Sequence, residues 1–277
     1  MTQQQRRWRG AVAAGVAVCL GCLGASGCSG GAVAEDARSA DPVPLLRQAG
    51  EHLVEAGTSK VTTSMEMATG GTRVTIRGQG VYDYGRRLGR LKVTLPQDPA
   101  GTNEHRPLIE LLAPGALFMK NRGAGVPADK WVRVDTAGLS DGNLVTGGAT
   151  DPFTAAELLR GTRTAAYLGR TDLAGTEVRH YRGTADLALA SKGAPQGVRE
   201  SLAAAAKGFA SAEVPFDVYL DDQGRIRKIR HRFGFVGGAA RGTVAVASTT
   251  LLYGFGAPVD VRLPASADIY TGRIAEH

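Results

Sequence analysis

The chain has 277 residues, a hydrophobic content of 43% and a formal net charge of +7 at pH 7, which fits one large domain or two small ones with a sizeable core. The only three cysteines are Cys19, Cys22 and Cys28, which excludes a disulfide or a thiolate metal site from the rest of the chain. The basic residues are spread out apart from one cluster at 225–232. This favours a strand face toward water or anionic headgroups over a nucleic-acid site.

The first 28 residues have the layout of a secretory signal peptide. Arg6, Arg7 and Arg9 precede an almost wholly apolar run at 11–24, which is too short to cross a bilayer about 30 Å thick. The small residues before Cys28 resemble the lipobox of bacterial lipoproteins, although Ala25 stands where the box usually carries leucine. The resemblance implies cleavage after residue 27 and acylation of Cys28 with diacylglyceryl and palmitate. Cys22 is the alternative lipidation site, and both the Sec and the twin-arginine export routes stay open.

Removing three arginines and no acid leaves 30 basic and 26 acidic residues in 29–277, a net charge of +4. Residues 28–43 are rich in glycine, alanine, serine and aspartate, which indicates a flexible tether. We therefore expect a single domain at 44–272, held at the outer face of the cell membrane by the lipid on Cys28.

The first half of the domain reads as one helix followed by strands. Apolar residues at helical spacing predict a helix from 41 to 56 that ends at Gly57. Period-two alternation then predicts strands at 60–68, 72–84, 87–95, 107–112, 116–120 and 130–135, joined by short turns or polar loops. Residues 136–150 contain four glycines and no clear periodicity.

The second half alternates helices with hairpins. A helix is predicted to open near Asp151, with either Asp151 as its cap or Thr154 and Glu157 as a capping box. Strands at 164–172 and 176–187 precede a helix at 195–210. Strands at 214–220, 225–235 and 243–254 then lead to an extended tail at 258–264. The fold class is α+β: a strongly curved antiparallel sheet of about 11 strands, a half barrel, with helices covering its concave face.

Several segments, taken in order, carry a family resemblance. They are residues 117–120, 130–134, 151–159, 175–183, 214–230 with the Asp-Asp-Gln-Gly turn, and 253–259. Together with the lipobox, these segments resemble the LppX/LprAFG-type actinobacterial lipoproteins, which share the LolA/LolB-like fold. The resemblance covers residues 45–270. It implies an eleven-stranded half barrel around an apolar cavity that binds lipoglycans or acylated lipids and carries them across the envelope.

The inward strand faces supply candidates for the lining of this cavity. They carry methionine, which adapts its shape, and glycine, which leaves room. The candidates are Met65, Met67, Ile76, Leu91, Val93, Phe216, Val218 and Leu220. The alternative is that they only pack the sheet against the helices, which would make the chain a non-catalytic envelope interaction or sensory module with a filled core.

No motif indicates an enzyme, a cofactor or a metal site. The five histidines form no ligand motif, and His180 and His231, which lie beside arginines, are expected to face solvent. The paired carboxylates Asp221 and Asp222 fit a hairpin turn. The expected partners are a membrane and a lipid or other apolar ligand, with no nucleic acid, and the oligomeric state is left open.

Overall fold

The computed structural model describes residues 41–277 except 70, 97–105, 122–124, 237–242 and 273–277. The predicted signal peptide, Cys22, Cys28 and nearly all of the predicted tether lie outside the described residues. Residues from Asp41 onward belong to one compact unit. Among the described residues, no helix has the length and apolar character that crossing a bilayer requires.

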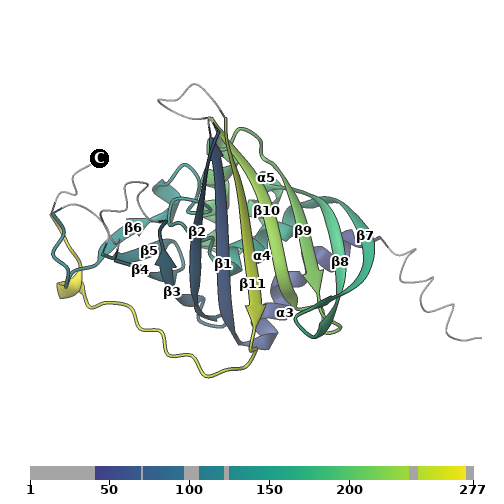
Figure 1. The fold of residues 1–277 in the computed structure, drawn as a ribbon, viewed down its shortest axis with the longest axis horizontal. Coiled ribbons are helices and arrows are strands. Elements are labelled where there is room, and N and C mark those ends of the chain that lie inside the picture. The colour runs from purple at the N-terminus through teal and green to yellow at the C-terminus, as the bar shows by residue number, and fades with distance from the viewer. Residues whose placement is uncertain (1–40, 70, 97–105, 122–124, 237–242, 273–277) are drawn as a thin grey trace, which may run out of the picture. The chain divides into compact units, whose positions relative to one another are not determined.

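Eleven antiparallel strands form one open sheet in the order β6-β5-β4-β3-β2-β1-β11-β10-β9-β8-β7 (Figure 1). The first six strands are β1 (Thr58–Thr69), β2 (Thr72–Asp83), β3 (Leu88–Thr94), β4 (Leu108–Ala113), β5 (Ala116–Lys120) and β6 (Val132–Asp135). The other five are β7 (Thr162–Leu173), β8 (Thr176–Asp186), β9 (Glu213–Leu220), β10 (Ile226–Val236) and β11 (Thr243–Tyr253). The first six run outward from the centre. The chain then crosses to the far edge and returns, so that β11 pairs with β1.

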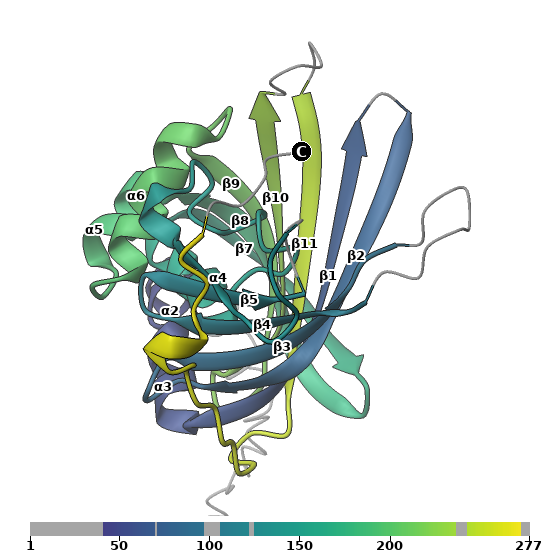
Figure 2. The same cartoon turned by 90° about the vertical axis from the view of Figure 1, so that its left-hand side faces the viewer.

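The sheet curves strongly, and the helices lie on its concave side (Figure 2). Glycines on the inward face permit close packing where the sheet bends: a Cβ added at Gly80 would lie 1.9 Å from the carbonyl oxygen of Arg90. A strand position with no side chain is typical of such close backbone approach. The predicted fold class is therefore confirmed, including the α+β composition, the strand number and the helix-covered hollow.

The helices are α2 (Val43–Arg47), α3 (Ala49–Ala56), α4 (Pro152–Glu157), α5 (Leu187–Gly193) and α6 (Val198–Gly208). Short 3-10 helices are η1 (Thr136–Gly138), η2 (Leu158–Gly161) and η3 (Ser266–Asp268). The Asp151 carboxylate accepts hydrogen bonds from the backbone N–H groups of Phe153 and Thr154, so the first of the two capping alternatives holds.

Two predicted elements differ from the structure. The helix predicted for 41–56 is split at Gln48 into α2 and α3. The strand predicted to run to Leu187 ends at Asp186, whose carboxylate accepts from the N–H of Leu189 and so starts helix α5. Local capping by the aspartate outweighs the strand alternation at this point.

A large hydrophobic core fills the space between the inward sheet face and helices α2–α6. A second, smaller cluster lies on the outer face of the sheet, where Val261 of the extended C-terminal tail packs against Leu111 and Phe118. Trp131 forms a parallel bridge with Ile269, so the tail also follows the β6 end of the sheet. The extended tail predicted for 258–264 is present.

Candidate ligand site between the sheet and the helices

The eight candidate cavity residues all lie on the inward face of the sheet, in two groups. Five belong to β1–β3 and three to β9, with β10 and β11 between the groups. Seven are buried and Met67 is half-buried, and all belong to or pack against the main core. Their inward orientation agrees with the alternation of the sequence, but their role in ligand binding stays a prediction.

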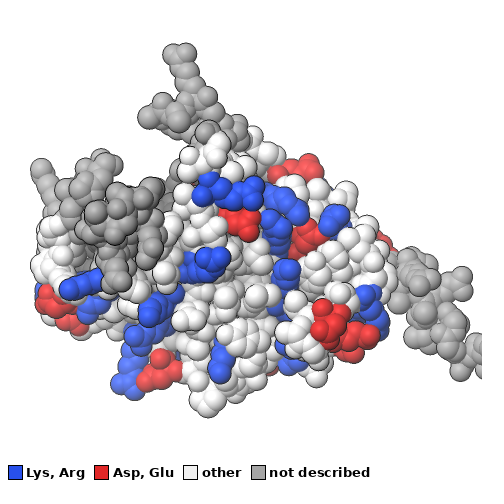
Figure 3. Space-filling view, in the orientation of Figure 1, with Lys and Arg blue, Asp and Glu red and all other residues white. Residues whose placement is uncertain are grey.

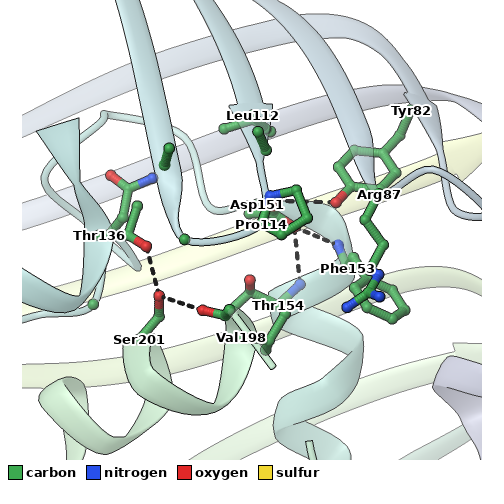
Figure 4. Close-up of a pocket in the computed structure, with 16 residues that line it drawn as sticks. Tyr82, Arg87, Leu112, Pro114, Thr136, Asp151, Phe153, Thr154, Val198 and Ser201 are labelled. Atoms are coloured by element: carbon green, nitrogen blue, oxygen red, sulfur yellow. Dashed lines mark hydrogen bonds between the residues drawn. The ribbon is translucent and has the colours of Figure 1, made fainter. Parts of the chain in front are cut away.

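Two pockets of the described residues lie away from these residues. The first is a cavity of about 20 Å³ between the β4–β5 turn, the start of α4 and the start of α6 (Figure 4). It has room for about one or two water molecules. Around it, Tyr82 donates a hydrogen bond to Asp151 at 3.3 Å, and the hydroxyls of Thr136 and Ser201 lie 2.7 Å apart.

The second pocket is an open groove of about 520 Å³ next to the first. Its wall includes three charged side chains, Arg87, Asp135 and Glu200, together with Pro114 and Gly197. Glu200 already accepts a hydrogen bond from the N–H of Gly197. A groove with this many charges lacks the apolar lining that an acyl chain needs.

An irregular, glycine-containing stretch, residues 139–150, lies at the centre of the hollow. We call it the plug segment. Leu144, Ala149 and Thr150 are at most 1% exposed, although the segment contains no helix or strand. A Cβ added at Gly148 would lie 3.3 Å from Ile76 and 3.4 Å from Val93. The plug segment thus covers two of the predicted cavity residues.

The plug segment also contacts the helix layer. A Cβ added at Gly142 would lie 2.0 Å from the carbonyl oxygen of Ser201 in α6. Gly142 has a φ of 57°, a left-handed conformation that favours glycine. The segment therefore lies between α6 on one side and β2 and β3 on the other, where a bound ligand is expected.

Many of the hydrogen bonds of the plug segment are internal. The Asp141 carboxylate accepts from the N–H groups of Asn143, Val145 and Thr146 at 2.6–3.1 Å. The Thr150 hydroxyl donates to the carbonyl of Leu144 and lies 2.6 Å from the Ser248 hydroxyl on β11. A segment that carries its own hydrogen bonds keeps them if it moves as a unit, which lowers the cost of displacing it.

Polar atoms lie on the inward face near the plug segment. Among the described residues, the hydroxyl of Thr63 and Nε2 of His231 are buried without a hydrogen-bond partner. His231 pairs with Ser248 across β10 and β11. The Thr63 hydroxyl lies over Gly78, where an added Cβ would be 2.5 Å from it and 3.5 Å from Ala149 of the plug segment. Buried polar groups without partners are uncommon in folded proteins and call for an explanation.

His231 corrects the expectation that this histidine faces solvent. Its side chain is 1% exposed and its ring lies 5.8 Å from that of Phe233. Burial lowers the pKa of His231 to about 3, so the imidazole is neutral at pH 7. His180 also departs from the expectation, because its side chain is 18% exposed and bonds Asp217 at 2.9 Å.

Of the two predicted turn carboxylates, Asp222 accepts a hydrogen bond from Arg170 at 3.3 Å, and Asp221 holds the turn itself. Asp221 accepts from the N–H groups of Gln223 and Arg225 and from the Arg225 guanidinium. Its oxygens are thus engaged within the β9–β10 turn. No group of three or more potential metal-ligating side chains occurs among the described residues.

No protein-family model matches the chain, and no curated protein matches it. Among solved structures, the chain is similar to the lipoprotein LppX of Mycobacterium tuberculosis, with 10% identity and a TM-score of 0.44 over 79% of this chain and 99% of that chain. It is also similar to LprF of Mycobacterium bovis, with 14% identity and a TM-score of 0.37 over 82% of this chain and 100% of that one.

A third similar structure is a LolA superfamily protein from Nitrosomonas europaea, with 13% identity and a TM-score of 0.35 over 78% of this chain and 94% of that one. These proteins are of the type that the sequence resemblance names. At such identities and TM-scores the likeness concerns the fold at most, and nothing about a ligand or partner follows from it.

Proposed function

We propose that this chain is an exported, membrane-anchored lipoprotein, acylated at Cys28, that binds a lipid or other apolar ligand between the curved sheet and the helices. In this proposal it has no catalytic role and acts as a binder or carrier. The observation that carries the proposal is the plug segment, an irregular stretch of chain that packs between α6 and strands β2 and β3.

Ligand binding in this proposal requires the plug segment to leave the sheet. Glycines form part of its contact with the sheet, so each such residue buries little apolar area there. Its departure would uncover Ile76 and Val93, and the freed volume would extend toward Met65, which pairs with Ile76 across β1 and β2. A lipid that leaves a bilayer loses about 0.8 kcal/mol for each CH₂ exposed to water, so an apolar groove of this kind is needed to receive it.

A second candidate function is a non-catalytic interaction or sensory module with a permanently filled core. It is favoured by the continuity of the core, because the eight candidate cavity residues lie within one packed cluster and line neither pocket. The two functions differ in whether the plug segment opens.

A disulfide between the plug segment and the sheet separates the two functions. The hydroxyls of Thr150 and Ser248 lie 2.6 Å apart, so cysteines at both positions are close enough for a bond of about 2.05 Å. We suggest the full chain carrying Thr150→Cys and Ser248→Cys, with Cys19, Cys22 and Cys28 changed to serine to leave one possible pair. The probe is a fluorescent hexadecanoate, and its affinity is measured before and after oxidation.

The proposal expects binding by the reduced protein, at least tenfold weaker binding after oxidation, and recovery on reduction. The control carries Thr150→Cys with Ser248→Ala and is expected to bind the probe equally in both conditions. Equal binding by the locked and unlocked forms would place the ligand elsewhere. A reduced protein that neither binds the probe nor carries lipid by mass spectrometry would support the filled-core module.

A further inference from the structure

The outer, convex face of the sheet has a charge distribution that ligand binding in the hollow does not explain. Figure 3 shows lysine and arginine side chains gathered over the central strands, with few acidic ones among them. Strand register places them on one face. Arg182 pairs with Asp217, Asp217 with Arg230, and the same row continues through Thr249 and Ser64 to Arg77.

This row and its neighbours form a surface that we call the basic face. From β8 and β10 it includes Arg182, Lys228, Arg230 and Arg232. From β1–β3 it includes Lys60, Arg77, Arg90 and Lys92. The same rows hold two acids, Glu66 and Asp217, so the basic face has a net charge of +6.

The two acids of the basic face are already engaged. Asp217 accepts from Arg182 at 2.8 Å and from Arg232 and His180 at 2.9 Å, while Glu66 pairs with Arg230 at 3.6 Å. Burial opposes the ionisation of Asp217, but the hydrogen bonds from its three partners outweigh burial and hold its pKa below the usual range. One carboxylate therefore binds two guanidinium groups. Since each guanidinium has five N–H donors, most of the donors of Arg182 and Arg232 are not used by Asp217.

The arginines that share Asp217 remain open to solvent. The side chain of Arg182 is 60% exposed and that of Arg232 is 43% exposed. The basic face therefore presents positive charge to solvent on the convex side of the sheet.

We propose that the basic face docks on the anionic surface of a lipid bilayer. The face is broad and formed by side chains of extended strands. Its aromatic residues include Tyr219, which stacks on His180, and Tyr253, which is 42% exposed, and tyrosine is a residue that membrane interfaces favour. Clustered lysine and arginine are attracted to anionic headgroups within about 8 Å of the surface at physiological salt. The inference extends the proposed anchoring: with Cys28 as the anchor, the 13 residues to Asp41 span at most about 45 Å, so the bilayer stays within reach.

The test uses the full chain with Cys19, Cys22 and Cys28 changed to serine, so that no lipid anchor contributes. Binding is measured by sedimentation with vesicles of phosphatidylcholine alone and with vesicles containing phosphatidylglycerol as well. We expect binding to the anionic vesicles only, with loss of binding at high salt. Arg77→Gln, Arg90→Gln and Lys92→Gln together are expected to weaken it about a hundredfold, from about fivefold for each cation.

The matched control removes the same charge from the helix side, with Lys192→Gln, Arg199→Gln and Lys207→Gln, and is expected to keep binding within about twofold. If both triple variants lose vesicle binding equally, binding depends on net charge alone, and the proposed docking surface is wrong. Equal binding to neutral vesicles, or binding to RNA with no binding to anionic vesicles, would overturn it as well. Hexadecanoate binding separates the two proposals, because it depends on the hollow and not on the outer face. If only the docking surface is wrong, hexadecanoate still binds; if only the ligand site is wrong, the anionic vesicles still bind and hexadecanoate does not.

Discussion

The buried imidazole of His231 makes a quantitative prediction about stability at acidic pH. In the folded protein its pKa is about 3, whereas an unfolded chain has a histidine pKa of about 6.5. Below pH 6.5 the unfolded state therefore binds a proton that the folded state does not bind, so stability falls as the pH falls toward 3. Between pH 7 and pH 5 this single group lowers the free energy of unfolding by about 2 kcal/mol.

The assay is urea unfolding followed by far-UV circular dichroism at pH 7 and pH 5, for the wild type and for His231→Leu. Leucine cannot titrate, and no hydrogen bond at Nε2 is lost because that atom has no partner. The variant is expected to lose about 2 kcal/mol less than the wild type between the two pH values. His52→Gln, which changes a more exposed histidine of α3, is the control and is expected to lose as much as the wild type.

The comparison of the wild type with His231→Leu isolates the buried ring, because burial alone shifts the pKa of His231. If His231→Leu and the wild type lose the same stability, the imidazole protonates in the folded state. His231 would then not lie in a dry core.

Two further substitutions test the sheet and the helix layer. Asp151→Ala removes the cap of α4 and the acceptor of the Tyr82 hydroxyl. Urea titrations are expected to show a free energy of unfolding lower by about 2 kcal/mol. An unchanged free energy of unfolding would mean that α4 does not depend on its cap. Gly80→Ala places a Cβ 1.9 Å from a carbonyl oxygen that cannot rotate away, and should cost about 3 kcal/mol. Gly85→Ala, whose Cβ meets nothing closer than 3.5 Å, is the control, and equal unfolding midpoints would contradict the close strand approach.

The strands could be predicted because alternation in a half-buried sheet leaves a direct mark on the sequence. Val214, Phe216, Val218 and Leu220 alternate with more polar residues, and all four point into the core. Helix α5 was missed because the alternation of β8 runs into its first residues. The available signal was Asp186 before a Leu-Ala-Leu-Ala run, since aspartate is a preferred helix cap.

The error on His231 arose from its neighbours in sequence. Arg230 and Arg232 are charged, but in a strand they lie on the opposite face from His231. Ile229 and Phe233 share the face of His231 and are buried, so the period-two pattern contained the correct answer. Charge on adjacent residues is a poor guide to exposure within a strand.

The plug segment could not be predicted from periodicity because it has none. It is built on the side chains of Asp141 and Asn143, which accept backbone hydrogen bonds, and on glycines that allow close contact with α6 and the sheet. An aspartate and an asparagine flanking a glycine indicate a local turn. They do not indicate whether that turn lies on the surface or in the core, because that depends on the shape of the hollow around it.

The polar atoms near the plug segment connect its stability with the proposed binding. A buried hydroxyl or imidazole nitrogen without a partner costs about 1–3 kcal/mol, so the packing around Thr63 and His231 is less favourable than an apolar core would be. Where opening lets water reach these atoms, it relieves this cost and the free energy of opening falls by the same amount. A ligand whose hydroxyl or ester group bonds these atoms would recover that cost on binding, whereas a plain hydrocarbon would not. The same two side chains would then favour opening and select a lipid with a polar group near its acyl chains.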